Sequence, residues 1–398
     1  MRYATRMSCL EDQSLLSVME IQETEDMVLF TGGFPSPETY PLEAITDSFM
    51  QTLRSEGKAA LSYCSTSGYK PLREAIRRRM NDTFDLKFDL DEVIITSGSQ
   101  QGLDMSAMLF INKGDVVLFE TPSYLGAVSA LRAHEAHLIG VPTDQHGLEL
   151  EALKKALDQY GDRVKMIYVN PDFQNPTGRS WSEERRIKFM ELISGYDVAV
   201  IEDAAYSELA YDRKPHKPLS YYDKKGQVIY IGTFSKTFCP GLRVAWLCAR
   251  KEVMQKYLIL KNAADLSSSA ISQMQMAYYL EHYNLDAHIA EICALYKHRR
   301  DVMAKAINEY FSEEVHFLLP QGGLFIWLEL PEGCDTRELL KVAVKNHVAF
   351  VPSAAFYPDA VRSNEMRLNF SNMKDEEIVN GIHSLAMALT QYLDERSN

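Results

Sequence analysis

The strongest constraint on the fold is a regular alternation between short strand-like runs and longer helical patterns. The short runs are rich in valine and isoleucine, and they predict strands at residues 93–96, 116–119, 166–169, 198–202, 228–232 and 243–248. Helical patterns separate several of these runs, at residues 100–111, 150–160 and 182–194. Strands that alternate with helices in this way favour an α/β layer whose sheet is mostly parallel.

The pattern changes after a long helical region at about residues 270–311. Strand-like runs follow at 323–330, 349–351 and 366–370, with helical patterns at 336–345 and at the C-terminal end. This second pattern predicts a smaller α/β domain. We therefore expect three parts, with soft boundaries: an N-terminal segment at 1–45 that packs with the small domain and the active site, a large domain at 46–290 and a small domain at 291–398.

Composition excludes several classes of protein. A chain of 398 residues that is 46% hydrophobic can bury a large core and more than one domain. A net charge of -13 argues against binding to nucleic acid or to an anionic membrane. There is no apolar run long enough to cross a bilayer and no signal core, so we expect a cytoplasmic protein. The six cysteines lie far apart without a Cys-x-x-Cys pair, which predicts free thiols and no metal site.

Polar residues follow the ends of several predicted strands, where ligands bind in open α/β folds. Residues 97–101 (SGSQQ) lie between a strand and a helix, which suits either an anion cradle or a tight turn that needs glycine and serine for its shape. Tyr124 follows the next strand, where its ring could lie against a flat cofactor or pack in the core. Asn175 precedes a proline, so it is either a ligand donor or part of a common turn.

Charged residues follow two further strands. Asp203 ends an apolar strand, and a buried carboxylate there needs a cation, either a pyridinium nitrogen or a structural ion-pair partner. Lys236 comes shortly after another apolar strand, where burial could lower its pKa enough for nucleophile or base chemistry, although most lysines are solvated at the surface. Ser235 and Arg243 would complete a cup for a phosphate group.

These residues follow one another in a meaningful order along the chain. They supply in turn a phosphate loop, a stacking ring, a donor for a ring oxygen, an acid for a ring nitrogen, a Schiff-base lysine and a phosphate arginine. Each residue alone has an ordinary structural explanation, but the whole set at successive strand ends is hard to explain in that way. A lysine with these partners is what pyridoxal phosphate (PLP) requires, so the set indicates a PLP site.

The chain resembles the fold-type I, class I/II PLP-dependent aminotransferases, and among them the branch that contains 2-aminoadipate and kynurenine aminotransferases. The resemblance covers nearly the whole length, through the runs TGGFP at 31–35, QNPTG at 174–178, DAAY at 203–206, SKTFCPGLR at 235–243 and MRLNF at 366–370. It implies a large domain with a mixed, mostly parallel seven-stranded sheet between helices, plus a smaller α/β C-terminal domain. It also implies transfer of an amino group from an L-amino acid to a 2-oxo acid, with 2-oxoglutarate as the expected acceptor.

The resemblance assigns roles around the cofactor. Lys236 carries the internal aldimine, Asp203 pairs with the pyridine nitrogen and Tyr124 stacks on the ring, so these are the expected catalytic residues. Asn175 and Tyr206 contact the ring hydroxyl. The expected phosphate ligands are Ser99, Gln100, Ser235 and Arg243.

The resemblance also assigns roles toward the substrate and a second subunit. Arg367 grips the substrate α-carboxylate in a pairing that lysine could not copy, with Asn175 beside it. Gly33 belongs to an N-terminal segment that closes on the substrate in such enzymes. Tyr63 matches the tyrosine that reaches the partner subunit's phosphate, which implies a homodimer with shared active sites.

Two positions depart from the pattern of this branch. Met19 stands where an arginine that can contact a distal carboxylate is expected, so we expect donors with apolar or aromatic side chains rather than 2-aminoadipate. Ser353 replaces a glycine and is expected to narrow the entrance near the substrate. Two other functions remain open, because one fold hosts several: another fold-type I PLP enzyme, such as a carbon–sulfur β-lyase or a decarboxylase, and a non-catalytic PLP-binding sensor domain.

Overall fold

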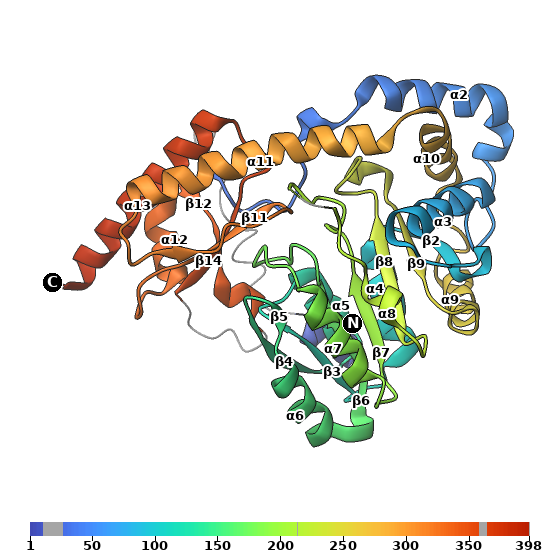
Figure 1. Ribbon diagram of the computed structural model, residues 1–398, viewed down its shortest axis with the longest axis horizontal. Coiled ribbons are helices and arrows are strands. Elements are labelled where there is room, and N and C mark those ends of the chain that lie inside the picture. Colours follow the sequence, from blue (N-terminus) through green and yellow to red (C-terminus); the bar gives the residue numbers. More distant parts are fainter. Residues whose placement is uncertain (11–26, 213, 358–363, 398) are drawn as a thin grey trace.

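A large mixed sheet forms the centre of the bigger part of the molecule (Figure 1). The computed structural model describes residues 1–10, 27–212, 214–357 and 364–397. Eight strands pair in the order β2-β9-β8-β7-β6-β3-β4-β5. Their bounds are Val93–Ser97 (β2), Val116–Thr121 (β3), His137–Asp144 (β4), Gly147–Leu148 (β5), Val164–Val169 (β6), Ala199–Asp203 (β7), Val228–Thr233 (β8) and Val244–Cys248 (β9).

The direction of the strands confirms a mostly parallel sheet. Strands β4, β3, β6, β7 and β8 pair in parallel, whereas β9 is antiparallel to both of its neighbours, β8 and β2. The short β5 pairs antiparallel with β4 at the edge and adds an eighth strand to the expected seven. The carboxyl ends of the parallel strands therefore lie along one edge of the sheet.

Helices cover both faces of this sheet. Successive side chains of one strand, β3, illustrate this because they pack alternately against helices on opposite faces. Val117 and Phe119 of β3 pack in one apolar cluster with α4, α5 and α9, while Val116 and Leu118 pack in another with α6 and α7. Burial on both faces explains why the strands read as nearly continuous apolar runs. The helices of this part are α2 (Leu42–Ala60), α3 (Lys70–Phe84), α4 (Ser99–Phe110), α5 (Leu125–Ala133), α6 (Leu150–Tyr160), α7 (Glu183–Ile193), α8 (Leu219–Tyr222), α9 (Lys251–Ala264) and α10 (Ala270–His282).

The smaller C-terminal part contains a four-stranded antiparallel sheet in the order β10-β11-β14-β13. A two-stranded parallel sheet joins β1 near the N-terminus to β12. The elements are β1 (Val28–Leu29), β10 (His316–Phe317), β11 (Phe325–Glu329), α12 (Thr336–Lys345), β12 (Val348–Ala349), β13 (Val351–Pro352), β14 (Glu365–Asn369) and α13 (Asp375–Ser397). Short 3-10 helices are η1 (Thr5–Cys9), η2 (Pro37–Thr39), η3 (Leu90–Glu92), η4 (Gly161–Arg163), η5 (Pro240–Leu242) and η6 (Ser353–Phe356).

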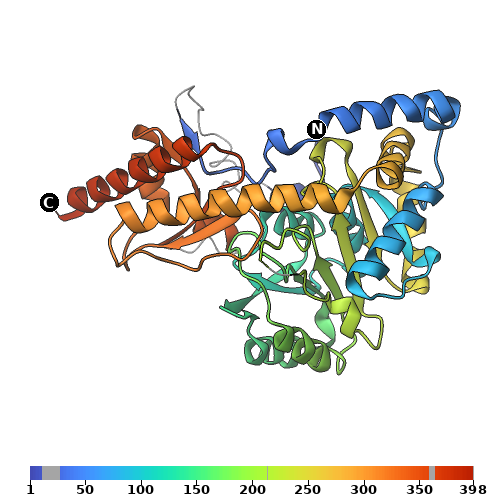
Figure 2. The same cartoon turned by 45° about the horizontal axis from the view of Figure 1, so that its top comes forward.

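One long helix, α11 (Leu285–Tyr310), extends from the larger part into the smaller part in both views (Figures 1 and 2). A single apolar cluster follows the same path, from Trp246 in β9 through Tyr296 in α11 to Leu368 in β14. The boundary expected near residue 290 therefore falls within a continuous helix. The division into 1–45, 46–290 and 291–398 stays a prediction.

Membrane spans, metal ligands and thiols can each be described from the structure. No helix in the described part of the chain is long and apolar enough to span a bilayer. Within the same ranges, no group of three or more His, Cys, Asp or Glu side chains could hold a metal ion. The cysteines that the structure describes as free thiols are Cys64, Cys239, Cys248, Cys293 and Cys334.

Candidate active site

Most of the predicted site residues lie just beyond the carboxyl ends of the parallel strands. Tyr124 follows β3, Asn175 follows β6, Asp203 ends β7, and Lys236 follows β8. Because these strands are parallel neighbours, their ends meet along one edge of the sheet. Arg367 reaches the same place from β14 in the smaller part, where it bonds Asn175.

Lys236 is half-buried, and its Nζ donates a hydrogen bond to the Gly33 carbonyl at 2.8 Å. Burial lowers the pKa of this amine to about 8; Asp203 opposes the shift, whereas Arg367 and Arg243 add to it. Burial lowers the pKa because it disfavours the charged form of an amine. Lys236 is therefore neutral over a pH range in which ordinary lysines remain protonated.

This pKa predicts how fast Lys236 reacts with an aldehyde at different pH values. Only the neutral amine attacks a carbonyl carbon, so the rate should rise with pH up to about 8 and then level off. The measurement is borohydride trapping of the apoprotein with PLP between about pH 6 and 11, followed by mass analysis of the peptide that contains Lys236. A rate that still rises at pH 10, as for a solvated lysine with a pKa near 10.4, contradicts the expectation.

Asp203 is a buried carboxylate held only by neutral donors. Tyr168 donates its hydroxyl to Oδ2 at 2.9 Å, and the Ala205 backbone N–H donates to Oδ1 at 3.3 Å. Burial raises the pKa of the Asp203 carboxyl, and these two donors and Lys236 partly offset that rise. Among the residues that the structure describes, none forms an ion pair with Asp203. A structural salt bridge therefore does not account for this carboxylate, which needs a cation to stabilise its charge.

Arg367 lies in an enclosed position at the junction of the two parts. Its Nη1 donates to Asn175 Oδ1 at 2.8 Å, and its Nη2 donates to the Thr31 carbonyl at 2.6 Å. The guanidinium lies 4.4 Å from the centroid of the Phe325 ring and 5.1 Å from that of Phe356. Burial lowers the pKa of Arg367 to about 10. The buried Nε has no hydrogen-bond partner in the described structure, so it remains available to an acceptor.

Asn175 and Tyr206 lie beside this arginine. The Asn175 backbone N–H donates to Asn170 Oδ1 at 2.9 Å, which fixes the turn after β6. The buried Tyr206 ring meets Phe325 edge-on at 5.9 Å between centroids. Burial raises the pKa of the Tyr206 phenol, and a hydrogen bond with the Asn175 side chain acts in the opposite direction.

Tyr124 is the residue before α5, and its half-buried ring lies over the first turn of that helix. Gly126 permits this arrangement, because a Cβ there would lie 2.5 Å from the phenol oxygen of Tyr124. The Gln100 amide donates to the Gly126 carbonyl at 2.8 Å, so the turn that begins α4 is tied to the segment that carries Tyr124.

The turn before α4 has the geometry that an anion cradle requires. Gly98 has a φ of +82°, and a Cβ at this position would lie 2.0 Å from Nη2 of Arg243. Ser99 opens α4, so its N–H belongs to the unpaired donors at the start of a helix. On the other side, Thr233 donates its hydroxyl to Ser235 Oγ at 3.0 Å. No hydrogen bond or ion pair within the described ranges engages the Arg243 guanidinium, which lies exposed beside this cradle.

These unsatisfied groups fit PLP. Asp203 supplies an anion that lacks a cation, as a protonated ring nitrogen requires, while Arg243 and the start of α4 supply donors that suit a phosphate. Lys236 follows β8, the strand beside β7, which ends at Asp203, and the charges of Asp203 and Arg243 both influence its pKa.

Three further residues were singled out from the sequence. Tyr63 is 88% exposed, so this chain alone does not enclose it in the site. Ser353 opens η6 and is fully buried, and its Oγ has no hydrogen-bond partner in the part of the chain that the structure describes. Met19 lies outside the described residues.

The buried residues whose hydrogen bonds hold the Asp203 and Asn175 segments in place were not identified from the sequence. Asn170 donates its amide to the Asp203 carbonyl at 2.6 Å, in addition to its bond with Asn175. The buried Glu120 accepts from the Asn170 N–H and from the Trp181 indole, both at 2.7 Å. Burial raises the pKa of Glu120 to about 7, and the donors oppose this. A signal did exist, because Asn170 directly follows a strand and a glutamate within the run VVLFET is unusual.

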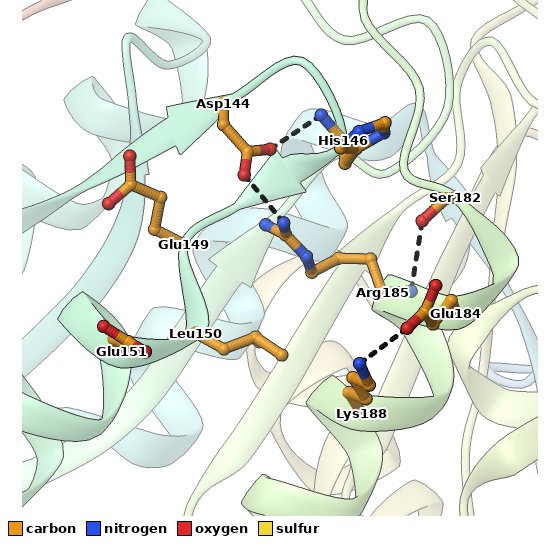
Figure 3. Close-up of a pocket in the computed structure, with 9 residues that line it drawn as sticks. All are labelled: Asp144, His146, Glu149, Leu150, Glu151, Ser182, Glu184, Arg185 and Lys188. Carbon is orange, nitrogen blue, oxygen red and sulfur yellow. Dashed lines mark hydrogen bonds and ion pairs between the residues drawn. The ribbon is translucent and has the colours of Figure 1, made fainter.

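A separate pocket lies at the β5 end of the large sheet (Figure 3). Its arginine and lysine side chains, Arg185 and Lys188, form ion pairs with acidic residues of the same pocket. Arg185 bonds Asp144 at 2.7 Å and the Gly147 carbonyl at 3.1 Å, and Lys188 bonds Glu184 at 2.6 Å. The Arg185 contacts hold the β4–β5 hairpin against α7, and the Lys188–Glu184 pair lies within α7, so we assign the pocket a structural role.

Comparisons with known proteins agree with this geometry. The sequence profile of the family described as aminotransferase class I and II matches residues 24–385. An aromatic-amino-acid aminotransferase of Thermococcus litoralis is 38% identical over 96% of this chain and 92% of its own length. A 2-aminoadipate transaminase of Thermus thermophilus is 32% identical over 96% and 94%. The crystal structure of a Pyrococcus horikoshii kynurenine aminotransferase in complex with PMP superposes with a TM-score of 0.94 at 37% identity, over 98% of this chain and 97% of that one.

Proposed function

This chain belongs to the class I and II aminotransferases and performs PLP-dependent transfer of amino groups, and from that premise we propose how its own residues do so. The donor we propose is an L-amino acid with an apolar or aromatic side chain, and the acceptor is 2-oxoglutarate. Lys236 is the proposed lysine that binds PLP covalently. One observation carries this assignment: the half-buried Lys236 amine, with a pKa of about 8, lies near a buried Asp203 that lacks a cationic partner.

The proposed roles follow from the positions of the side chains. When bound, PLP supplies an electron sink for the charge that remains when the Cα–H bond of the amino acid breaks. Asp203 holds a proton at the ring nitrogen, because its carboxylate is the buried anion of the site. Lys236 removes and returns a proton at Nζ, since its lowered pKa suits a general base near neutral pH.

The remaining residues bind and orient. Ser99, Gln100, Ser235 and Arg243 are the proposed phosphate ligands, and Tyr124, Asn175 and Tyr206 contact the ring. Arg367 orients the α-carboxylate, and Gly33 lies at the entrance, where its carbonyl accepts from Lys236. The apolar cluster of Trp327, Val351, Ala355 and Phe356 adjoins Arg367 and supports a preference for apolar donors.

Replacement of Arg367 by lysine tests the carboxylate assignment. Lysine keeps the charge but loses the planar fork that bonds Asn175 and Thr31 and that can hold a carboxylate through two parallel hydrogen bonds. Loss of one charge-assisted bond of about 1.5–3 kcal/mol should raise KM for the amino acid about 10- to 150-fold. Steady-state kinetics measure this change, and Arg337→Lys, at a half-exposed arginine in α12, is the matched control. An unchanged KM contradicts the assignment.

The visible spectrum of the PLP-loaded protein tests the function itself. Titration with a panel of amino acids, without an oxo acid, should convert the bound cofactor to its amino form, and 2-oxoglutarate should reverse the change. The order of affinities ranks the donors, and phenylalanine should precede 2-aminoadipate. Release of pyruvate, ammonia or carbon dioxide without an acceptor would instead identify a lyase or a decarboxylase.

The proposed assembly is a cytoplasmic homodimer with shared active sites. Tyr63 and Arg243 are both exposed in the single chain, which is consistent with a partner subunit that brings its own tyrosine to the phosphate. The free thiols fit a reducing compartment. Mixing Tyr63→Ala with Lys236→Ala subunits tests the sharing, because hybrid dimers should regain activity that neither variant has; a monomer in sedimentation experiments rules it out.

A further inference from the structure

A buried ion pair lies against the turn that begins α4. Lys261, in the last turn of α9, has a fully buried side chain, and its Nζ contacts the Asp265 carboxylate oxygens at 2.9 and 2.8 Å. The same ammonium donates to Ser268 Oγ at 2.9 Å and to Gln101 Oε1 at 3.3 Å. Its hydrogens are thus fully engaged by acceptors, and of these acceptors only Gln101 belongs to the 97–101 turn of the candidate site.

The partners of Lys261 all lead to the turn at residues 97–101. Gln101 Oε1 also accepts from the Ser97 backbone N–H at 2.8 Å, and Gln101 Nε2 donates to Asp265 Oδ2 at 2.8 Å. The Ser97 and Ser268 hydroxyls are 3.1 Å apart. Through Gln101 and Ser268, the ion pair therefore fixes both the backbone and the side chain of Ser97, the residue immediately before Gly98.

The opposite side of this turn faces Arg243. A Cβ on Gly98 would lie 2.0 Å from the Arg243 Nη2, so the guanidinium lies close against the turn. The turn therefore lies between the Lys261 network on one side and Arg243 on the other. A phosphate cradle needs this kind of fixed N–H geometry, because misplaced donors lose strength steeply with angle.

Stability alone does not explain a buried pair of this kind. Removal of two charges from water costs several kcal/mol per ion, which their attraction offsets only when the geometry is good, and apolar replacements are often as stable. Asp265 neutralises the ammonium, so the pair adds no net charge near the turn. Its effect is to hold the turn in one conformation. The comparable pair on the same helix, Lys251 with Asp91, is more than half exposed and has no such connection to the turn.

We propose that Lys261, acting with Asp265 through Gln101 and Ser268, is a positioning residue that holds the 97–101 turn in shape for the phosphate of PLP. This inference rests on the proposed function, because it assumes that the turn binds the phosphate. Lys261 does not touch the cofactor in this arrangement. Its removal should therefore weaken the recognition of the phosphate group and leave the recognition of the ring intact.

The test compares the affinity of the apoprotein for PLP with its affinity for pyridoxal, which lacks the phosphate. Equilibrium dialysis gives the two dissociation constants for the wild type, Lys261→Met, Ser268→Ala and the control Lys251→Met. For Lys261→Met, we expect the PLP dissociation constant to rise at least about tenfold while that of pyridoxal stays within about twofold, since one charge-assisted network is lost. Ser268→Ala should shift the ratio in the same direction by less, and Lys251→Met should leave it unchanged.

The outcomes separate the inference from the function on which it rests. An equal loss of affinity for both ligands in Lys261→Met, or no loss at all, overturns the positioning role while the site stands. A wild type that does not prefer PLP over pyridoxal overturns the phosphate assignment of the turn itself, and the inference with it. If Lys261→Met does not fold, Ser268→Ala decides: a lowered preference for PLP supports the role, and an unchanged preference overturns it.

Discussion

Replacing Lys236 with alanine is expected to abolish amino-group transfer and the visible absorbance band of the covalent link between Lys236 and the cofactor. The Lys236 amine is half-buried and has a pKa of about 8, so it can act both as the nucleophile that holds PLP and as the base that moves the proton. Loss of the proton transfer alone should lower kcat about 10²- to 10⁴-fold, and loss of the covalent link adds to this. Stopped-flow kinetics and the visible spectrum measure the two effects separately.

The control for this prediction is Lys251→Ala, which removes an exposed lysine of α9. It should leave both the spectrum and kcat unchanged. A Lys236→Ala protein that is folded by circular dichroism and still turns over at more than a few per cent of the wild-type rate excludes Lys236 as the catalytic lysine.

Replacing Asp203 with asparagine should have the next largest effect on catalysis. Asparagine has the same size and still accepts a hydrogen bond from Tyr168, but it carries no charge to keep a ring nitrogen protonated. Loss of a preorganised electrostatic partner in a buried site should lower kcat on the order of 10²- to 10³-fold. The pH dependence of the cofactor absorbance should change as well, because the protonation of the ring no longer depends on a nearby carboxylate.

Glu202→Gln is the matched control, because Glu202 precedes Asp203 in the same strand and is also fully buried. Neighbouring residues of a strand point to opposite faces, and Glu202 accepts from the Leu219 N–H at 2.8 Å, away from the site. This control should affect stability more than the absorbance spectrum. Equal spectra and rates for Asp203→Asn and the wild type would remove Asp203 from the mechanism.

The sequence predicts much of the fold because the local signals are strong. The helical patterns at 150–160 and 336–345 coincide with α6 and α12, whose apolar residues recur at helical spacing. Strand β4 was not predicted, since His137–Asp144 contains Gly140 and Pro142, which weaken the pattern of a strand. The long helical region at 270–311 is two helices, because Asn284 caps the start of α11 through a bond to the Ala287 N–H.

The residues of the candidate site likewise fall into those that the sequence predicts and those that it does not. Residues that directly follow strands, such as Asn175, Asp203 and Lys236, could be predicted because their position in the sequence already places them at the edge of the sheet. The supporting residues Tyr168 and Lys261 could not be predicted in this way. Tyr168 lies within the buried strand β6 and resembles core, whereas Lys261 lies on the largely exposed helix α9, where a lysine is expected to be solvated. Only the folded chain brings Lys261 next to Gln101, across 160 positions.

The hydrogen bond between Arg367 and Asn175 has a further consequence, because the two residues come from different parts of the molecule. The proposed grip on a carboxylate would exist only while the strand that carries Arg367 is docked against the turn after β6. Docking and carboxylate binding are therefore linked equilibria, and each must strengthen the other by the same factor. A substitution that loosens the junction far from either residue should lower the affinity for every amino acid alike, whatever its side chain.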